Sequence, residues 1–266
     1  MAFGLMPYKY QEHYLGDAGK DPHPTSPEER ARGFRILWGA GAAMVLAIAL
    51  VYFGVLAVDV TQLAKIAGVA MSLLGILYFA AVLIFADLTK EERGRVGVIA
   101  IFFLCAAMFW AGFEQQATSF NLFAQDYTNR AWLGGLFPTG EHPASWYQTA
   151  NPLFVVLFAP FFAYLWVWLG ARNLDPSAPA KFGLGLILLG TGFLVMMEAA
   201  HLIVADGGKV APTWLILTYL MHTFGELCLS PVGLSNVTKL APQRFVGQMM
   251  GTWFLGSALG NLVAGL

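Results

Sequence analysis

Long apolar intervals, most of them about 20 residues in length, are separated along this chain by polar segments. A helix of that length crosses the hydrocarbon core of a bilayer. Inside lipid the intervals must be helical, because every backbone N–H and C=O then finds a partner within its own segment. The pattern predicts seven membrane-spanning helices, at residues 36–58, 66–86, 96–125, 149–171, 182–205, 210–238 and from about 245 to 266.

Two longer polar segments interrupt this pattern. Residues 7–33 predict a linker, and residues 25–30 within it carry the cap residue, proline and acidic residues typical of a helix start. Residues 126–148 are rich in glycine and proline and predict a loop.

The composition supports a membrane environment. Of 266 residues, 58% are hydrophobic and only 12% are charged. A soluble domain carries about 25% charged residues, so this chain cannot cover a water-facing surface and its solvent must be largely lipid. The net charge of -1 gives no indication of a nucleic-acid partner. Cys105 and Cys228 fall in apolar runs, which indicates buried thiols rather than a disulfide or a metal site.

Lysine and arginine are concentrated in alternate connections between the predicted spans. Because such connections usually lie in the cytoplasm, we expect a cytoplasmic linker at 7–33 and a third span that runs outward. The basic residues of these connections are Arg30, Arg32, Arg35, Lys90, Arg93, Arg95, Arg172, Lys181, Lys239 and Arg244.

Three carboxylates interrupt the predicted spans: Glu114, Glu198 and Glu226. A charge at the bilayer centre costs about 2.5–3.5 kcal/mol on insertion scales, and such residues often mark a substrate or proton path. Glu198 lies eight positions before Asp206, so we expect it near the outer headgroups with a structural role. Glu114 and Glu226 lie deep in their spans, and we predict a functional role for both.

Polar residues follow Glu114 in its span. Glu114, Thr118, Asn121 and Gln125 are spaced by four, three and four, which predicts one helical face. An aqueous cavity would explain this face. The alternative is a helix end that loses its apolar character.

The span around Glu226 combines charge, histidine and proline. His222, Glu226 and Ser230 are four residues apart and share a helical face. Pro231 removes a backbone hydrogen bond, and the flanking glycines 225 and 233 favour a kink or hinge there. A single membrane histidine is more often a hydrogen-bonded packing residue than a proton carrier, so we expect packing for His222 and keep a proton role as the alternative.

Other features are less specific. Asn151 precedes Pro152 at a helix start and could be a simple cap. Trp253 could line a cavity, anchor an interface or pack, and Gly256 and Gly260 have the spacing that lets helices approach closely. The sequence shows no phosphate loop, metal spacing or nucleophile motif; the one candidate ligand pair, Glu198 with His201, is weak.

Several motifs, in this order, resemble the proton-dependent oligopeptide transporter family, a branch of the major facilitator superfamily. The resemblance covers nearly the whole chain. Its segments are Phe113-Glu114-Gln115 with Asn121-Leu122-Phe123-Ala124; residues 146–154, from Trp146 through Asn151-Pro152 to Phe154; His222-Thr223-Phe224-Gly225-Glu226-Leu227; Ser230-Pro231-Val232-Gly233-Leu234-Ser235; and Lys239-Leu240-Ala241-Pro242.

The resemblance implies an all-α membrane protein in three parts. Residues 1–33 would be a cytoplasmic linker, 34–95 an inserted transmembrane hairpin, and 96–266 the C-terminal helix bundle of the transporter. The spans from the third onward would match helices seven to eleven of a twelve-helix core. We therefore expect an incomplete chain that lacks the N-terminal half and the last helix, and that does not transport alone.

The resemblance also implies residue roles. Glu114 would pair with an arginine of the first helix and take part in proton coupling. Glu226 would receive the peptide amino group and contribute to coupling, and Asn151 would contact the peptide backbone or terminus. Ser230 and Trp253 would line the substrate site, and Pro231 would mark the bend used in gating.

The sequence and the resemblance together predict proton-coupled symport of di- and tripeptides across the bacterial inner membrane. The partners would be peptides, protons, the lipid bilayer and the N-terminal half; we expect no enzyme activity, cofactor, metal or nucleic acid. The alternatives are transport of another small solute such as nitrate, a membrane enzyme or receptor using Glu198, His201 and His222, and a structural subunit without a substrate. An acidic Glu226 disfavours an anionic substrate.

Overall fold

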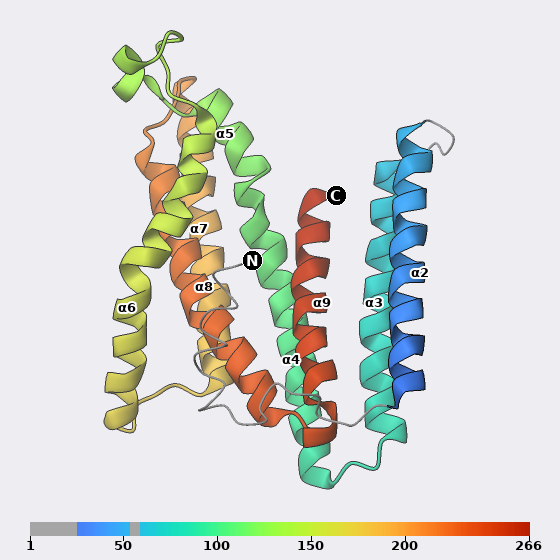
Figure 1. Cartoon of the computed structure of the whole chain (residues 1–266). Helices are drawn as coiled ribbons and strands as arrows, with labels where there is room; N and C mark the ends of the chain where they lie inside the picture. The colour runs from blue at the N-terminus through green and yellow to red at the C-terminus, as the bar shows by residue number, and fades with distance from the viewer. Residues whose placement is uncertain (1–25, 54–58) are drawn as a thin grey trace, which may run out of the picture. The chain divides into compact units, whose positions relative to one another are not determined.

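The computed structural model describes residues 26–53 and 59–266. Most of the predicted linker at 1–33 therefore lies outside the described residues. The described chain is helical (Figure 1). Its elements are α2 (Pro27–Tyr52), α3 (Val60–Phe85), α4 (Lys90–Phe113), η1 (Glu114–Gln116), α5 (Ser119–Tyr127), η2 (Ala131–Leu136), η3 (Ala144–Thr149), α6 (Ala150–Ala171), α7 (Ala178–Asp206), α8 (Thr213–Leu240), η4 (Gln243–Phe245) and α9 (Val246–Gly265).

The chain divides into two units, Met1–Asp59 and Val60–Leu266. In the first unit α2 begins at Pro27, as the cap and proline signals predict. The remaining helices belong to the second unit. Within the described residues, six helices are long and apolar enough to cross a membrane. The seventh predicted span forms α9, a helix of 20 residues that is less apolar because it carries Gln248, Thr252 and Asn261.

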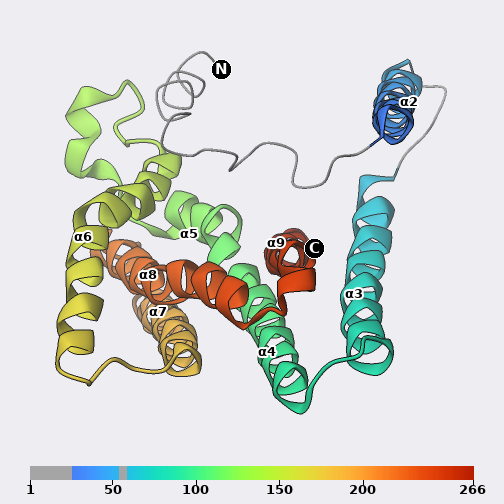
Figure 2. The same cartoon turned by 60° about the horizontal axis from the view of Figure 1, so that its bottom comes forward.

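In the second unit α4 lies between α9 on one side and α7 with α8 on the other (Figure 2). The approach of α9 to α4 depends on two glycines, as their spacing predicts. A Cβ on Gly256 would lie 3.0 Å from the carbonyl oxygen of Phe103, and one on Gly260 would lie 2.5 Å from that of Ala107. The backbones can meet at this distance only because both side chains are absent.

Large apolar side chains cover the outer surface of the second unit. On α6, for example, Val156, Tyr164 and Val167 are each about two-thirds exposed or more. A water-soluble protein rarely leaves so continuous an apolar surface. These side chains are suited to contact acyl chains.

The third predicted span differs from a single helix. The chain leaves the α-helical path at Glu114, passes through the short 3-10 turn η1, and resumes as α5 at Ser119. Thr118, at the start of α5, has φ −110° and ψ −93°, which is not helical. The expectation of one continuous face from Glu114 to Gln125 is therefore wrong, because the break rotates α5 relative to α4.

The basic connections gather at one end of the second unit. The α3–α4, α6–α7 and α8–α9 connections all lie at the bottom of Figure 1. Arg244 in the α8–α9 connection donates a hydrogen bond to the backbone carbonyl of Asp87 in the α3–α4 connection. The charge asymmetry in the sequence thus corresponds to one physical end of the bundle.

The opposite end carries the loop that the sequence predicts at residues 126–148, and specific contacts order it. Residues Thr128 and Val210 form a parallel bridge that joins the loop after α5 to the α7–α8 turn. Glu141 accepts hydrogen bonds from Arg130 at 2.6 Å and from Lys209 at 2.9 Å. The Lys209 hydrogen bond, with the charge of Arg130, holds the pKa of Glu141 below its ordinary value.

Candidate functional site

Asn151 connects α6 to α8. Its side-chain nitrogen donates hydrogen bonds to Thr223 Oγ1 at 3.0 Å and to Glu226 Oε2 at 3.1 Å. Thr223 in turn donates to the backbone carbonyl of Tyr219 at 2.7 Å. Asn151 therefore acts as a link between two helices, not only as a helix cap. It also orients one oxygen of a half-buried carboxylate.

Glu114 lies at the junction of α4 and η1 and is partly buried. Gln116, at the end of the same turn, lies 3.4 Å from Nδ1 of His222, one helical turn before Glu226. The structure therefore brings both predicted functional acids into one neighbourhood, although they come from different helices. Both residues are partly exposed.

The residue after Glu114 ties η1 to the end of α9. Gln115 Nε2 donates to the carbonyl oxygen of Ala264 at 3.4 Å, and its Oε1 accepts from Ser119 at 2.6 Å. Thr118 donates to the same oxygen at 3.1 Å. Sequence reasoning missed this role, because a glutamine beside a buried acid has no spacing signal of its own.

His222 is fully buried, as expected for a packing residue. Its Nδ1 lies 3.4 Å from Gln116 Nε2, which connects η1 to α8. Tyr219 strengthens this connection by donating to the carbonyl of Gln116 at 3.3 Å. Gln116 was also missed in the sequence, since its partners lie more than 100 positions away.

Trp253 packs in the core. It is 5% exposed and meets the ring of Phe182 edge-on, with centroids 5.8 Å apart. Its indole occupies the space that a side chain at position 233 would take, so Gly233 is needed there. Trp253 thus contacts α8 about two turns beyond Glu226 and is separate from the Asn151–Glu226 link.

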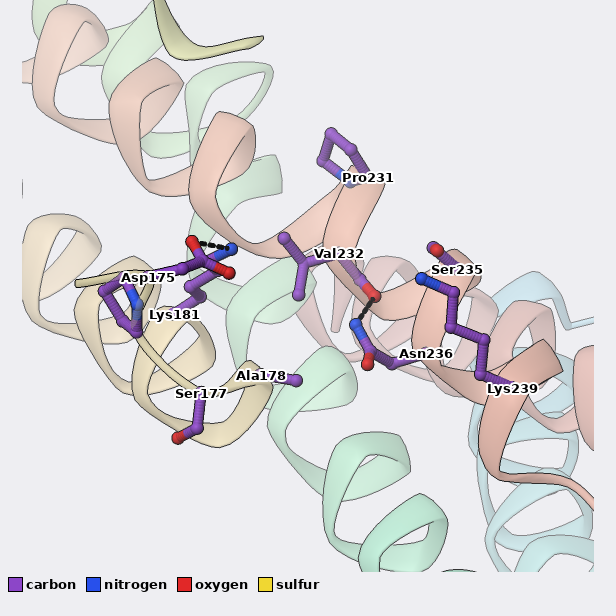
Figure 3. Close-up of a pocket in the computed structure, with 10 residues that line it drawn as sticks. Asp175, Ser177, Ala178, Lys181, Pro231, Val232, Ser235, Asn236 and Lys239 are labelled. Atoms are coloured by element: carbon purple, nitrogen blue, oxygen red, sulfur yellow. Dashed lines mark hydrogen bonds and ion pairs between the residues drawn. The ribbon is translucent and has the colours of Figure 1, made fainter. Parts of the chain in front are cut away.

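Pro231 lies inside α8, which remains helical on both sides of it. It borders a polar cavity of about 390 Å³ between the start of α7 and the last turns of α8 (Figure 3). Ser230 is the neighbouring residue but does not line this cavity. The lining residues are Asp175, Pro176, Ser177, Ala178, Lys181, Pro231, Val232, Ser235, Asn236 and Lys239.

Lys181 is the buried charge of this cavity. It is 8% exposed, and its Nζ lies 2.7 Å from Asp175 Oδ1 (Figure 3). The same nitrogen lies 4.4 Å from the centroid of the Trp166 ring. A carboxylate and an aromatic face thus compensate the charge of Lys181.

Glu198 and His201 lie apart from these clusters. Their side chains are 56% and 67% exposed and approach each other at 3.6 Å. The expected position of Glu198 near the outer headgroups stays a prediction.

Comparisons with known proteins identify the family. A family model described as the POT family matches residues 59–266. The peptide transporter YePEPT of Yersinia enterocolitica is 40% identical over 257 residues, covering 96% of this chain and 49% of that protein. A di-/tripeptide transporter of Lactococcus lactis is 32% identical over 271 residues, covering 99% of this chain and 52% of that protein.

Solved structures agree. A crystal structure of the peptide transporter POT in complex with sulfate superposes with a TM-score of 0.75 at 34% identity, covering 97% of this chain and 50% of that chain. A POT family transporter in complex with 5-aminolevulinic acid gives a TM-score of 0.76 at 30% identity, covering 99% of this chain and 53% of that chain. These relatives carry names of transporters, not of enzymes.

The chain spans about half the length of the curated relatives it matches. Its apolar helices and its bacterial relatives identify a multi-pass protein of the inner membrane. The fold is the all-helical bundle of the major facilitator type. The chain belongs to the POT family, and it corresponds to a C-terminal portion of that family's transporters.

Proposed function

We propose that this chain forms the C-terminal portion of a proton-coupled symporter of di- and tripeptides. The observation that carries the proposal is the Asn151–Glu226 link, which holds an oriented carboxylate on α8. Contacts of Gln116 with His222 and Tyr219 bring the turn that begins at Glu114 against the same helix. Relatives named as peptide and di-/tripeptide transporters support the substrate class. A related structure with alafosfalin supports peptide-like ligands.

Glu226 supplies the negative charge for the amino group of a peptide. Asn151 holds Oε2 in place through a hydrogen bond of 3.1 Å and leaves the other oxygen available to a cation. A fixed carboxylate loses less side-chain entropy when it binds an ammonium group. This arrangement favours an amino terminus and disfavours an anionic solute such as nitrate.

Glu114 carries the coupling proton in this scheme. Burial disfavours the charged form of a carboxylate, whereas a nearby cation favours it. An arginine from the N-terminal half of the transporter would supply that cation. Protonation of Glu114 would break the ion pair and allow the two halves to move relative to each other.

Pro231 is the proposed hinge of gating. A proline interrupts the hydrogen-bond ladder of α8 at this point. The adjoining cavity leaves space beside the last turns of α8, into which they could move. Trp253 is packed in the core, so it would contact substrate only after such a movement. Ser230, next to Pro231, would move with the same segment of α8.

The proposed organisation follows the family. Residues 34–95, which contain α3 and most of α2, would be an inserted hairpin, and residues 96–266 the transporter bundle. The end of the bundle with the basic connections would face the cytoplasm. The N-terminal half of the transporter would complete the substrate site opposite Glu114 and Glu226.

The test uses the full-length transporter in proteoliposomes, with labelled dialanine as the probe. We expect Glu226→Gln to abolish both proton-driven uptake and exchange of internal for external peptide. Glu114→Gln should abolish proton-driven uptake and keep exchange, because exchange needs no net proton movement. Glu198→Gln, at an exposed carboxylate, is the matched control and should behave as wild type. Proton-driven uptake by Glu114→Gln at the wild-type rate would refute the coupling role.

A further inference from the structure

The buried side chain of His222 has no part in the scheme above. It is 0% exposed, and the rings of Phe113, Phe120 and Phe193 lie 6.3, 5.6 and 5.3 Å from its own. A Cβ at position 192 would overlap the imidazole, so Gly192 of α7 provides its space. Burial among apolar rings excludes water and peptide from this imidazole.

The two ring nitrogens of His222 have different surroundings. Nδ1 lies 3.4 Å from the side-chain nitrogen of Gln116. Nε2 is fully buried and, among the described residues, has no hydrogen-bond partner of good geometry. With the Gln116 amide oriented as in the structure, its nitrogen donates to Nδ1, which places the hydrogen of a neutral ring on Nε2.

Gln116 is thereby fixed to α8 at two points. Its side chain contacts His222, and its backbone carbonyl accepts from the hydroxyl of Tyr219 at 3.3 Å. Gln116 is itself 7% exposed, so neither contact competes with bulk water. Buried polar contacts of this kind are costly to break, because each leaves an unpaired group.

These contacts lie next to both proposed functional acids. Gln116 ends the 3-10 turn that Glu114 begins. His222 precedes Glu226 by one helical turn on the same face of α8. The contacts of Gln116 thus connect the turn that carries Glu114 to the segment of α8 that carries Glu226.

We propose that Gln116 and His222 are positioning residues, which couple the turn at Glu114 to the helix at Glu226. Neither residue binds the peptide or carries the coupling proton. Their contact fixes the distance between the two acids, so that a change at one acid moves the other. This inference rests on the proposed function, because it assigns the coupling path between the proposed proton and peptide sites.

The test compares His222→Leu with His222→Asn in the full-length transporter. Leucine removes the acceptor, whereas the Oδ1 of asparagine can occupy the place of Nδ1 and accept from Gln116. We expect His222→Leu to reduce proton-driven dialanine uptake about tenfold, the size of a typical coupling effect, while exchange changes less than about twofold. His222→Asn should recover most of the proton-driven uptake.

Three outcomes would overturn the inference. They are wild-type uptake by His222→Leu, equal losses in the leucine and asparagine variants, and a parallel loss of uptake and exchange, which would indicate packing alone. If His222→Leu fails to fold, Gln116→Met removes the same contact from the other side and is judged by the same measurements.

A substrate-independent measurement separates this inference from the proposed function. In full-length protein labelled with 15N-histidine, Gln116→Met should shift the Nδ1 resonance of His222. An unchanged resonance would refute the contact whether or not peptides are transported. Absence of dialanine uptake by the wild type would instead refute the proposed function.

Discussion

Asn151 and Glu226 are 75 positions apart in the chain, yet the amide of the first donates to the carboxylate of the second at 3.1 Å. The bond joins the first turn of α6 to the middle of α8. Helix starts are anchored by neighbouring loops, here by η3, so Asn151 presents its amide from a fixed position. The carboxylate of Glu226 is therefore oriented before any ligand arrives.

Removing this orientation should weaken peptide binding. In the full-length transporter, Asn151→Ala should raise the KM for dialanine about tenfold or more, since a hydrogen bond to a charged group contributes about 1.5–3 kcal/mol. Thr223→Val is the matched control, because it removes the other acceptor of Asn151 and leaves the bond to Glu226. Uptake kinetics distinguish the two, and an equal KM in both variants would contradict the orienting role of Asn151.

The close approach of α9 to α4 predicts a stability effect. Gly260→Ala places a methyl group 2.5 Å from the carbonyl of Ala107, so we expect a loss of about 1–3 kcal/mol from overpacking. A Cβ at Gly251 on the same helix has no neighbour within 4 Å among the described residues, so Gly251→Ala should keep or slightly raise stability, because alanine is the better helix former. Thermal unfolding in detergent measures the difference, and identical melting temperatures would argue against the tight contact.

The ion pair at the polar cavity predicts an asymmetric response. Asp175→Asn removes the carboxylate that pairs with the buried Lys181 and leaves the Trp166 ring beside its charge, whereas Lys181→Met removes the buried charge and leaves a carboxylate that is 41% exposed. Leaving a buried charge unpaired costs more than deleting it. We therefore expect Asp175→Asn to be the more destabilising change in the same unfolding measurement, and the opposite order would exclude a paired, buried Lys181.

The ordered loop at the other end predicts a pH effect. The pKa of Glu141 in the folded loop is lower than its ordinary value of 4.5, so its ion pairs contribute fully above that value. The contribution is lost as the pH falls through the lower, folded pKa. Hydrogen exchange at residues 128–143 should therefore quicken as the medium is acidified through this range.

The variant Glu141→Gln is the control for that effect. It cannot titrate, so its loop exchange should show no such acid-dependent step beyond the intrinsic pH dependence of exchange. An acid step of the same size in the variant would assign the effect to another group.

The sequence by itself determined the order and approximate positions of the apolar spans. Apolar length and backbone satisfaction in lipid are local properties, so the pattern located each span to within a few residues at most boundaries. It also selected Glu114 and Glu226, because an acid inside an apolar run is costly and therefore conspicuous. The spacing of Gly256 and Gly260 likewise predicted a close helix contact.

Only the tertiary structure decided how these elements meet. The break at Glu114 accompanies the long-range contacts of Gln115 with α9 and of Gln116 with α8. The sequence around Glu114 carries no local signal for these contacts. The link from Asn151 to Glu226 and the core position of Trp253 depend in the same way on which helices pack together. Hydrogen bonds and packing across helices are set by distances in space, and no periodicity along the chain encodes them.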